Sequence, residues 1–418
     1  MNGIAWFPFS EIFFSVKLGK NNYRIHMTFQ IKADPSCDLI NKMKWGQNVT
    51  APGHVGIWTL LEPAGTQNHA PQLCWADEAT LACVWMAGGQ EGTSGMSIYG
   101  ASLKKGRTRW SGPKLISQNV NCSEQNPLLF KGGDGRLHLI HTAQTARDPS
   151  DKSWQETGLP FSMQWTAKLH HQSTTRWGSR WTKAELLMPE PAFCRHPPVK
   201  IGDGKFLLPI YRSLDTGGAF ADDYSQVIEI NDKGEKNGNT RDVPESKGRV
   251  HGSLVKSADG KHLLQFFRSR RADRIYRSVA DQDGTNWSIP TPVELPNNNS
   301  SIQAIRLSNG LLAIVFNRFG LANQPVDQDW GTAQWPSTRW PLSIAISEDD
   351  GSTWPWIRDI DYGQGFAGQA NWHLNGPLAY PTIVEGIQGE LHIAYSWGSR
   401  TAIKYVCLNL GEVIGQSR

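Results

Sequence analysis

Short apolar segments separated by small polar turns recur along most of the chain. In six places two apolar segments, rich in β-branched or aromatic residues, flank a turn built on Asp-Gly, Asn-Gly or an equivalent pair. This pattern predicts β-hairpins, because such pairs adopt the backbone conformations that tight turns between strands require. The six segments are PQLCWADEATLACVWM, NPLLFKGGDGRLHLIH, PPVKIGDGKFLLPIY, GSLVKSADGKHLLQFF, IQAIRLSNGLLAIVF and PTIVEGIQGELHIAY.

A second kind of turn recurs between these hairpins, and its fullest copy is SEDDGSTW at residues 347–354. The Asp carboxylate can accept backbone N–H groups across the turn, and the Trp can pack beneath it. Weaker copies are ADQDGTNW at 280–287, KKGRTRW at 104–110 and TTRWGSRW at 174–181. Four turns of one design indicate a supersecondary unit that is used repeatedly.

The hairpin turns lie near residues 77, 134, 203, 259, 309 and 388, which predicts six blades of four strands each. We therefore expect an all-β fold, a six-bladed β-propeller. The last blade ends one strand short after AIKYVCLNL, and VGIWTLLE at 55–62 can supply the missing strand. Such an N-terminal strand would close the ring and protect the sheet edges. On this interpretation, residues 1–50 are an extension and 51–418 form the propeller.

Composition favours the same fold class. The 41 Gly, 24 Pro and 18 Trp are typical of short strands with many turns and not of helical bundles. A net charge of +4 over 418 residues gives little reason to expect nucleic acid as a partner, although it is compatible with an acidic substrate.

No apolar run reaches the roughly 18 residues of a membrane span, so we expect no membrane partner. Pro8, Glu11 and Lys17 interrupt the apolar start, which makes it a poor signal peptide and favours the cytoplasm. We expect no cofactor and no metal, because Cys and His lack metal-ligand spacing; Asp327 and Asp329, in one loop, are only a weak indication of Ca²⁺. The oligomeric state is left open.

Strand order sorts the loops between the two faces of the predicted propeller. The Asp-Gly turns and the Trp turns share one face, so the loops between second and third strands and the crossings between blades share the other. These segments are long and rich in functional groups: 88–95, 142–161, 212–225, 317–340 and 361–380. A closed scaffold with long loops on one face is expected to carry its site there.

The two kinds of turn, the six hairpins, and RWPLSIAISEDDGSTW followed by AYPTIVEGIQGELHIAYSW resemble the sialidase superfamily, in particular its BNR-repeat members, over about residues 55–410. In sialidases an Arg triad binds the substrate carboxylate, a Tyr activated by Glu is the nucleophile, and an Asp is the acid/base. The resemblance implies that Tyr380 is the nucleophile and that Arg268 and Arg339 bind the carboxylate. Paired guanidinium groups suit that task because each forms charge-assisted hydrogen bonds to both carboxylate oxygens.

Other positions depart from the family pattern. The first hairpin opens with His69-Ala70-Pro71 in place of an Arg-Ile-Pro-like motif, and the fourth has His251 in place of Glu. Glu91, in GGQEGTSG, lies in the loop expected to supply the acid/base. Because His69 and His251 begin innermost strands, we expect both to face the central funnel and count them as catalytic candidates.

Further candidates occupy the same type of position. We expect substrate contacts from Arg195, Arg212 and Asn126, with His196 beside them. The tryptophans of the long loops form either a sugar-stacking wall or anchors for those loops; they are Trp330, Trp335, Trp340 and Trp372.

Three function classes follow, all with an acidic oligosaccharide or glycan as partner. The leading hypothesis is an exo-glycoside hydrolase that releases a terminal, sialic-acid-like sugar; a Tyr nucleophile is an exception to the two-carboxylate scheme. The alternative is a polysaccharide lyase, in which Arg neutralises a uronate carboxylate while His or Tyr moves a proton. The third is a glycan-binding propeller without catalysis.

Overall fold

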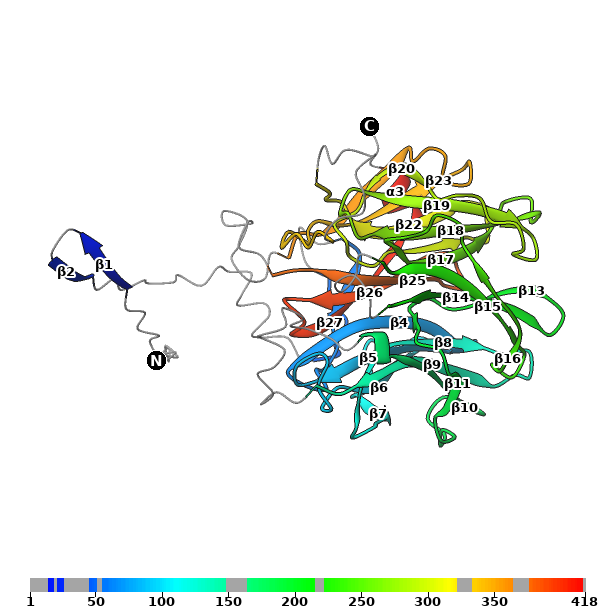
Figure 1. Cartoon of the computed structure of the whole chain (residues 1–418), viewed down its shortest axis with the longest axis horizontal. Helices are drawn as coiled ribbons and strands as arrows, with labels where there is room; N and C mark the ends of the chain where they lie inside the picture. The colour runs from blue at the N-terminus through cyan, green and yellow to red at the C-terminus, as the bar shows by residue number, and fades with distance from the viewer. Residues whose placement is uncertain are drawn as a thin grey trace. The chain divides into compact units, whose positions relative to one another are not determined.

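The computed structural model of the protein describes residues 14–18, 21–25, 45–50, 55–147, 164–214, 222–321, 333–363 and 376–415. The chain divides into two compact units, Met1–Lys42 and Met43–Arg418. In the first unit, β1 (Phe14–Leu18) and β2 (Asn21–Ile25) form an antiparallel hairpin. The second unit carries the other described elements (Figure 1).

Six antiparallel sheets form the blades of a β-propeller in the second unit (Figure 1), which confirms the predicted fold class. Blade 1 consists of β4 (Gln67–Asp77), β5 (Thr80–Gly88), β6 (Ser97–Lys104) and β7 (Lys114–Ser117). Blade 2 consists of β8 (Cys122–Lys131), β9 (Leu137–Thr145), β10 (Lys168–Thr174) and β11 (Glu185–Met188). Blade 3 consists of β12 (Phe193–Cys194), β13 (Val199–Gly202), β14 (Lys205–Arg212), β15 (Tyr224–Asn231) and β16 (Lys236–Asp242).

Blade 4 consists of β17 (Arg249–Lys256), β18 (His262–Ser269), β19 (Arg274–Asp281) and β20 (Thr291–Pro296). Blade 5 consists of β21 (Gln303–Arg306), β22 (Leu312–Asn317), β23 (Leu342–Ser347) and β24 (Trp356–Asp361). Blade 6 consists of β25 (Ala379–Glu385), β26 (Glu390–Trp397), β27 (Ala402–Asn409) and β3 (Ile57–Leu60). The described helical elements are short: η1 (Gln164–Thr166) and α3 (Leu410–Ile414). In the parts of the chain that are described, no helix is long and apolar enough to cross a membrane.

All six predicted hairpins are present as paired strands at the inner side of the blades. Blade 3 differs in one respect, because its innermost position is divided between β12 and β13, which both pair with β14. Two prolines, Pro197 and Pro198, lie in the interruption. Proline cannot donate to a strand ladder, which accounts for the break.

The ring is closed by β3, which pairs antiparallel with β27 through Leu60 opposite Lys404 and Ile57 opposite Cys407. The predicted closing strand is therefore confirmed. Hydrogen bonds strengthen the seam between blades 6 and 1: the Trp75 indole N–H donates to the Glu385 carbonyl at 2.9 Å. The first and last parts of the propeller thus lie side by side (Figure 1).

The turn at 347–354 has the predicted internal geometry. The Asp349 carboxylate accepts the Thr353 backbone N–H at 2.8 Å and the Thr353 hydroxyl at 2.7 Å. Although partial burial raises the pKa of Asp349, these bonds lower it more, so the carboxylate form is favoured. Gly351 has a φ of +79°, a conformation that favours glycine.

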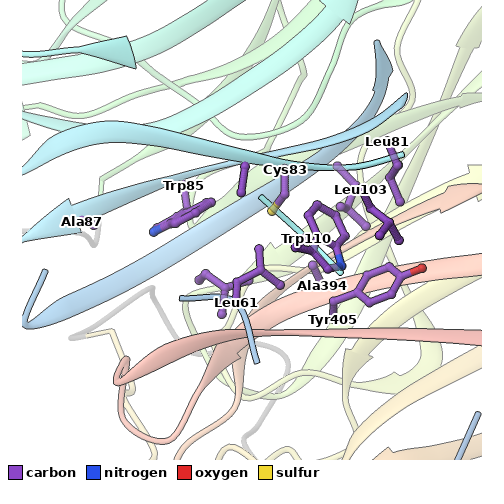
Figure 2. Packing of buried hydrophobic residues seen from close by; sticks show 12 residues of the cluster. Leu61, Leu81, Cys83, Trp85, Ala87, Leu103, Trp110, Ala394 and Tyr405 are labelled. Carbon is purple, nitrogen blue, oxygen red and sulfur yellow. The ribbon is translucent and has the colours of Figure 1, made fainter. Parts of the chain in front are cut away.

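The Trp of this turn packs against a neighbouring blade and not only beneath its own turn. Trp354 of blade 5 contacts Phe266 of blade 4 edge-on, with ring centroids 6.1 Å apart. Trp110 of blade 1 likewise meets Tyr405 of blade 6 at 5.0 Å, within the buried cluster drawn in Figure 2. Trp287 of blade 4 belongs to a cluster with residues of blade 3. The turns therefore supply packing between blades.

The closing strand yields a test of ring stability. Trp58 is 3% exposed, so we expect Trp58→Ala to lower the free energy of unfolding by about 3–5 kcal/mol. Ile57 is adjacent on the same strand but 41% exposed, and Ile57→Ala should cost less than about 1 kcal/mol. Urea unfolding followed by tryptophan fluorescence measures both variants. Similar small losses in the two would show that closure contributes little.

Candidate functional site

A cavity of about 490 Å³ lies on the face that carries the long loops, as predicted, and all six blades contribute to its wall. Its residues come mainly from the starts of the innermost strands and the ends of the strands next to them. They are Gln67, Gln90, Glu91, Gln125, Asn126, Gln164, Phe193, Tyr211, His251, Arg268, Arg270, Trp335, Arg339, Tyr380 and Arg400.

Three of the lining residues owe their direction to the same backbone irregularity. Asn126, His251 and Tyr380 have φ angles of 48°, 52° and 56°. Each lies where the register between the two inner strands of its blade shifts. Such bulges re-aim a side chain, and a non-glycine residue in this conformation costs roughly 1–3 kcal/mol. Directing these side chains into the cavity therefore costs free energy of folding.

The hydroxyl of Tyr380 is held by a guanidinium group. Arg268 donates from Nη1 to the Tyr380 oxygen at 2.7 Å and from Nε to Asn299 Oδ1 at 2.7 Å. Burial raises the pKa of Tyr380, but the positive charges of Arg268 and Arg339 outweigh it and leave the pKa below the ordinary value of 10. Because the phenol oxygen accepts this bond, the bond stabilises the phenolate relative to the neutral phenol.

Two histidine rings flank Tyr380. The His69 and His251 ring centroids lie 4.2 and 5.3 Å from that of Tyr380. Burial lowers both histidine pKa values far below 6.5, and nearby arginines lower them further, so both rings are neutral. His69 Nδ1 lies 2.8 Å from the Ser396 hydroxyl. Within the described residues, His69 Nε2 and His251 Nδ1 have no hydrogen-bond partner.

Four arginines line the cavity, and they differ in their partners. Arg270 pairs with buried Asp223 at 2.6 Å, and Arg400 pairs with Glu91. Arg268 and Arg339 have no carboxylate partner among the described residues. Burial lowers the pKa of Arg339 to about 10, and the charges of Arg268 and Arg400 add to this effect. Within the described part of the chain, the cavity thus presents two guanidinium groups without a compensating carboxylate, and it suits an anion.

Arg339 is positioned by its backbone. Its carbonyl accepts the Leu378 N–H at 3.1 Å and the Asn317 side-chain amide at 2.8 Å. Asn317 ends β22 of blade 5, and Leu378 precedes β25 of blade 6. Arg339 therefore stands at the junction of two blades, with its half-buried side chain at the cavity wall.

The structure brings most of the sequence-predicted residues together. Those at the cavity wall are Tyr380, His251, Glu91, Arg268, Arg339 and Asn126. His69 lies behind the Tyr380 ring. Arg195 does not line the cavity; it is buried and donates to the carbonyls of Pro71 and Tyr380 at 3.0 and 2.9 Å, so it holds the backbone beneath the site.

The remaining candidates lie elsewhere or cannot be placed. Arg212 is absent from the cavity wall, and His196 instead lines a second cavity of about 350 Å³ between blades 3, 4 and 5. Trp335 lines the first cavity, whereas Trp340 is buried and anchors its loop. Four residues lie outside the described parts of the chain: Trp330, Trp372, Asp327 and Asp329.

Sequence reasoning missed two of the cavity arginines. Arg270 follows Arg268 by two residues, and the period of two along a strand is the signal that would have placed both on one side. Arg400 lies in the turn between β26 and β27, and no motif marks it. Only the closure of the ring brings it close to Glu91 of blade 1.

Residues 79–393 match the family described as the BNR repeat-like domain, and the chain belongs to this family. No curated protein matches the chain. Among solved structures it is similar to the Hadza microbial sialidase Hz136, at 13% identity and a TM-score of 0.61 over 83% of this chain and 66% of that one.

Two further solved structures are similar. The NanB sialidase of Streptococcus pneumoniae is 12% identical, with a TM-score of 0.63 over 90% of this chain and 73% of that one. The intramolecular trans-sialidase of Ruminococcus gnavus, also 12% identical, has a TM-score of 0.61 over 88% of this chain and 98% of that one. At these identities the likeness establishes the sialidase-like fold alone.

The environment of Tyr380 yields a test by titration. We expect the wild-type protein to develop a tyrosinate absorbance below pH 10 that Tyr380→Phe lacks. Arg268→Gln should move this titration to higher pH, because it removes the charge and the hydrogen bond that stabilise the phenolate. Ultraviolet difference spectra against pH measure both effects. Superimposable curves for the wild type and Tyr380→Phe below pH 10 would contradict the assignment.

Proposed function

We propose that the protein is a sialidase-like exo-glycoside hydrolase that releases a terminal acidic sugar. The observation that carries the proposal is the contact between Arg268 Nη1 and the Tyr380 hydroxyl oxygen at 2.7 Å, with Arg339 nearby. A nucleophilic oxygen and two cations that have no carboxylate partner among the described residues match a substrate with a carboxylate next to its reacting carbon. The sialidases of similar fold support this class of substrate.

In the proposed reaction the Tyr380 phenolate oxygen attacks the anomeric carbon, and the bond from that carbon to the leaving oxygen breaks as that oxygen takes a proton from protonated Glu91 at the cavity wall. The Glu91 carboxylate then removes a proton from a water that attacks the anomeric carbon, and the bond from that carbon to Tyr380 breaks and returns the phenolate. Arg268 and Arg339 hold the sugar carboxylate. Here His251 replaces the carboxylate that activates Tyr in sialidases, so activation by Arg268 takes its place.

A second candidate, a polysaccharide lyase, is favoured by the histidines. His69 and His251 are neutral, pack against Tyr380, and each has one ring nitrogen without a partner among the described residues. A neutral imidazole can remove the proton next to a uronate carboxylate while arginines stabilise the resulting charge. Product analysis separates the two: a hydrolase yields a free sugar with water added, and a lyase yields an unsaturated uronate.

The carboxylate contacts can be tested by truncation. Arg339→Ala and Arg268→Ala should each weaken binding of an acidic sugar about 10- to 100-fold, because a charge-assisted hydrogen bond contributes roughly 1.5–3 kcal/mol. Arg274→Ala, on the exposed surface of blade 4, removes the same charge away from the cavity and should have little effect. Calorimetric titration measures the affinities. Equal affinity for the acid and its methyl ester would contradict the proposed role.

Tyr380→Phe deletes only the hydroxyl. We expect kcat to fall by at least about 1,000-fold if the oxygen is the nucleophile, while the melting temperature changes little. In a hydrolase, His69→Ala and His251→Ala should be milder than Tyr380→Phe, and in a lyase one of them should be as severe. Turnover on sialosides and on uronate oligosaccharides decides between the outcomes. Wild-type turnover by Tyr380→Phe would exclude a chemical role for this residue.

A further inference from the structure

Side chains of one blade cap the free strand edge of the next blade around the centre of the ring. The innermost strand of each blade pairs on one side only, so the N–H groups on its other edge need a further acceptor. At four junctions within the described strands, a side chain of the preceding blade supplies it. The acceptor oxygens and their backbone donors, with N···O distances, are Gln72 Oε1 and Leu129 (2.7 Å), Ser253 Oγ and Ala304 (3.0 Å), Gln303 Oε1 and Ile383 (3.1 Å), and Thr382 Oγ1 and Leu73 (3.2 Å).

The sequence shows why the other two junctions differ. The six innermost strands carry PQL, PLL, PPV, GSL, IQA and PTI at the same place, and in the capped junctions the second residue accepts from the third residue of the next blade. In blades 2 and 3 the second residue is Leu128 or Pro198, whose side chain has no acceptor atom. The corresponding N–H groups, those of Val199 and Leu254, therefore lack this cap. Both residues pair with the second strand of their blade as their counterparts do, which directs these N–H groups toward the centre.

The second cavity lies where the caps are missing. Its volume of about 350 Å³ is typical of a small-molecule site, and Pro198, Val199 and Leu254 belong to its wall. It lies farther along the innermost strands than the cavity around Tyr380, toward the Asp-Gly turns, and the two cavities share no wall residue. The apolar part of the wall also includes Pro197, Val255, Ala304 and Ile305.

A buried histidine adds a hydrogen-bonding atom to this wall. His196 is 1% exposed, and its Nδ1 has no hydrogen-bond partner among the described residues. Burial lowers the pKa of His196 far below 6.5, and the charge of Arg195 lowers it further, so the ring is neutral and donates from one nitrogen. Its Nε2 lies 3.4 Å from the Ser301 hydroxyl oxygen. When this hydroxyl donates to Nε2, the ring proton is on Nδ1, which then joins the uncapped backbone N–H groups as a donor.

The positive charges at this wall do not require an anion. Arg306 is paired with Asp350 and also donates to the carbonyls of Lys256 and Gly310. Lys256 is exposed, and water and salt screen its charge. An uncharged acceptor therefore suits the cavity, and the capped junctions show which groups the protein itself uses there, namely carboxamides and hydroxyls.

We propose that the second cavity binds a small uncharged molecule whose apolar body carries a carboxamide group. The carboxamide oxygen takes the place of the missing side-chain oxygen and accepts from the Leu254 N–H, in the way that Gln303 accepts from Ile383. His196 Nδ1 is the second donor, and the apolar wall packs against the body of the ligand. This site is separate from the cavity around Tyr380, and the inference does not depend on the proposed function.

Benzamide is the probe, and its affinity for the wild-type protein is measured from the ligand NMR signals. We expect saturable binding that is at least about 10-fold tighter than that of toluene, which lacks the carboxamide, and of acetamide, which lacks the apolar body. Equally tight binding of toluene would mean that the cavity recognises apolar surface alone and would overturn the inference. Absence of benzamide binding would show that solvent alone meets these polar groups and would overturn it too.

Restoring the missing cap locates the site. Pro198→Gln gives blade 3 the carboxamide that blades 1 and 5 already have, so it should cap Leu254 and lower the affinity for benzamide at least about 10-fold. Pro292→Gln makes the same exchange at an exposed position of β20 and should leave the affinity unchanged. Arg339→Ala alters only the first cavity and should also leave it unchanged. Wild-type affinity in Pro198→Gln, or loss of binding in Arg339→Ala, would overturn the assignment.

A second variant covers the case in which Pro198→Gln does not fold. Pro198→Thr supplies the shorter hydroxyl acceptor that blade 6 has in Thr382, and it should likewise weaken benzamide binding. The melting temperature shows whether each variant folds. A folded Pro198→Thr variant with wild-type affinity for benzamide would overturn the assignment, and the comparison of the three probes on the wild-type protein needs no variant.

Discussion

The pairing of β27 with β3 is the constraint on which the rest of the propeller depends. Each blade hides its apolar faces only when it has a neighbour on both sides, and the last blade obtains its outer strand from the start of the domain. The same seam brings His69 of blade 1 against Tyr380 of blade 6, and Arg400 of blade 6 to Glu91 of blade 1. Closure of the ring therefore stabilises the fold and assembles one side of the cavity at once.

At the cavity, two arginine side chains carry positive charge without a compensating carboxylate among the described residues. Arg268 and Arg339 border the cavity without a carboxylate partner among the described residues, and burial works against the charge of both. Strained backbone at His251 and Tyr380 adds a further cost. Packing between blades, as at Trp110 and its neighbours in Figure 2, offsets such costs away from the site. A site that is unfavourable for folding is typical of function, and under the proposed function the partner of these arginines is the acidic ligand.

Under the proposed function, the replacement of one family carboxylate by the neutral imidazole of His251 changes how Tyr380 is activated. Where sialidases place Glu beside Tyr, this chain has His251, whose ring is kept neutral by burial and by surrounding arginines. The positive charges of Arg268 and Arg339 lower the pKa of Tyr380 instead, and Arg268 also donates a hydrogen bond to its oxygen. In the proposed reaction, activation of Tyr380 therefore depends on a cation and not on a general base. Because a neutral His251 stands in place of the Glu, the polysaccharide lyase is retained as the second candidate function.

The sequence by itself determined the fold, because hairpin turns and Trp turns are local signals that repeat, and a blade count follows from their number. It also located Tyr380, Arg268, Arg339, His251, Glu91 and Asn126 on one face, since strand order alone fixes which strand ends share that face. Only the tertiary structure decided which of the candidates meet. Arg195 turned out to be buried beneath the site and Arg212 to lie away from it, while Arg400 entered from an unmarked turn. The direction of a side chain depends on bulges, on strand register and on the neighbouring blades. A contact between residues more than 300 positions apart, such as Arg400 and Glu91, leaves no local pattern in the sequence.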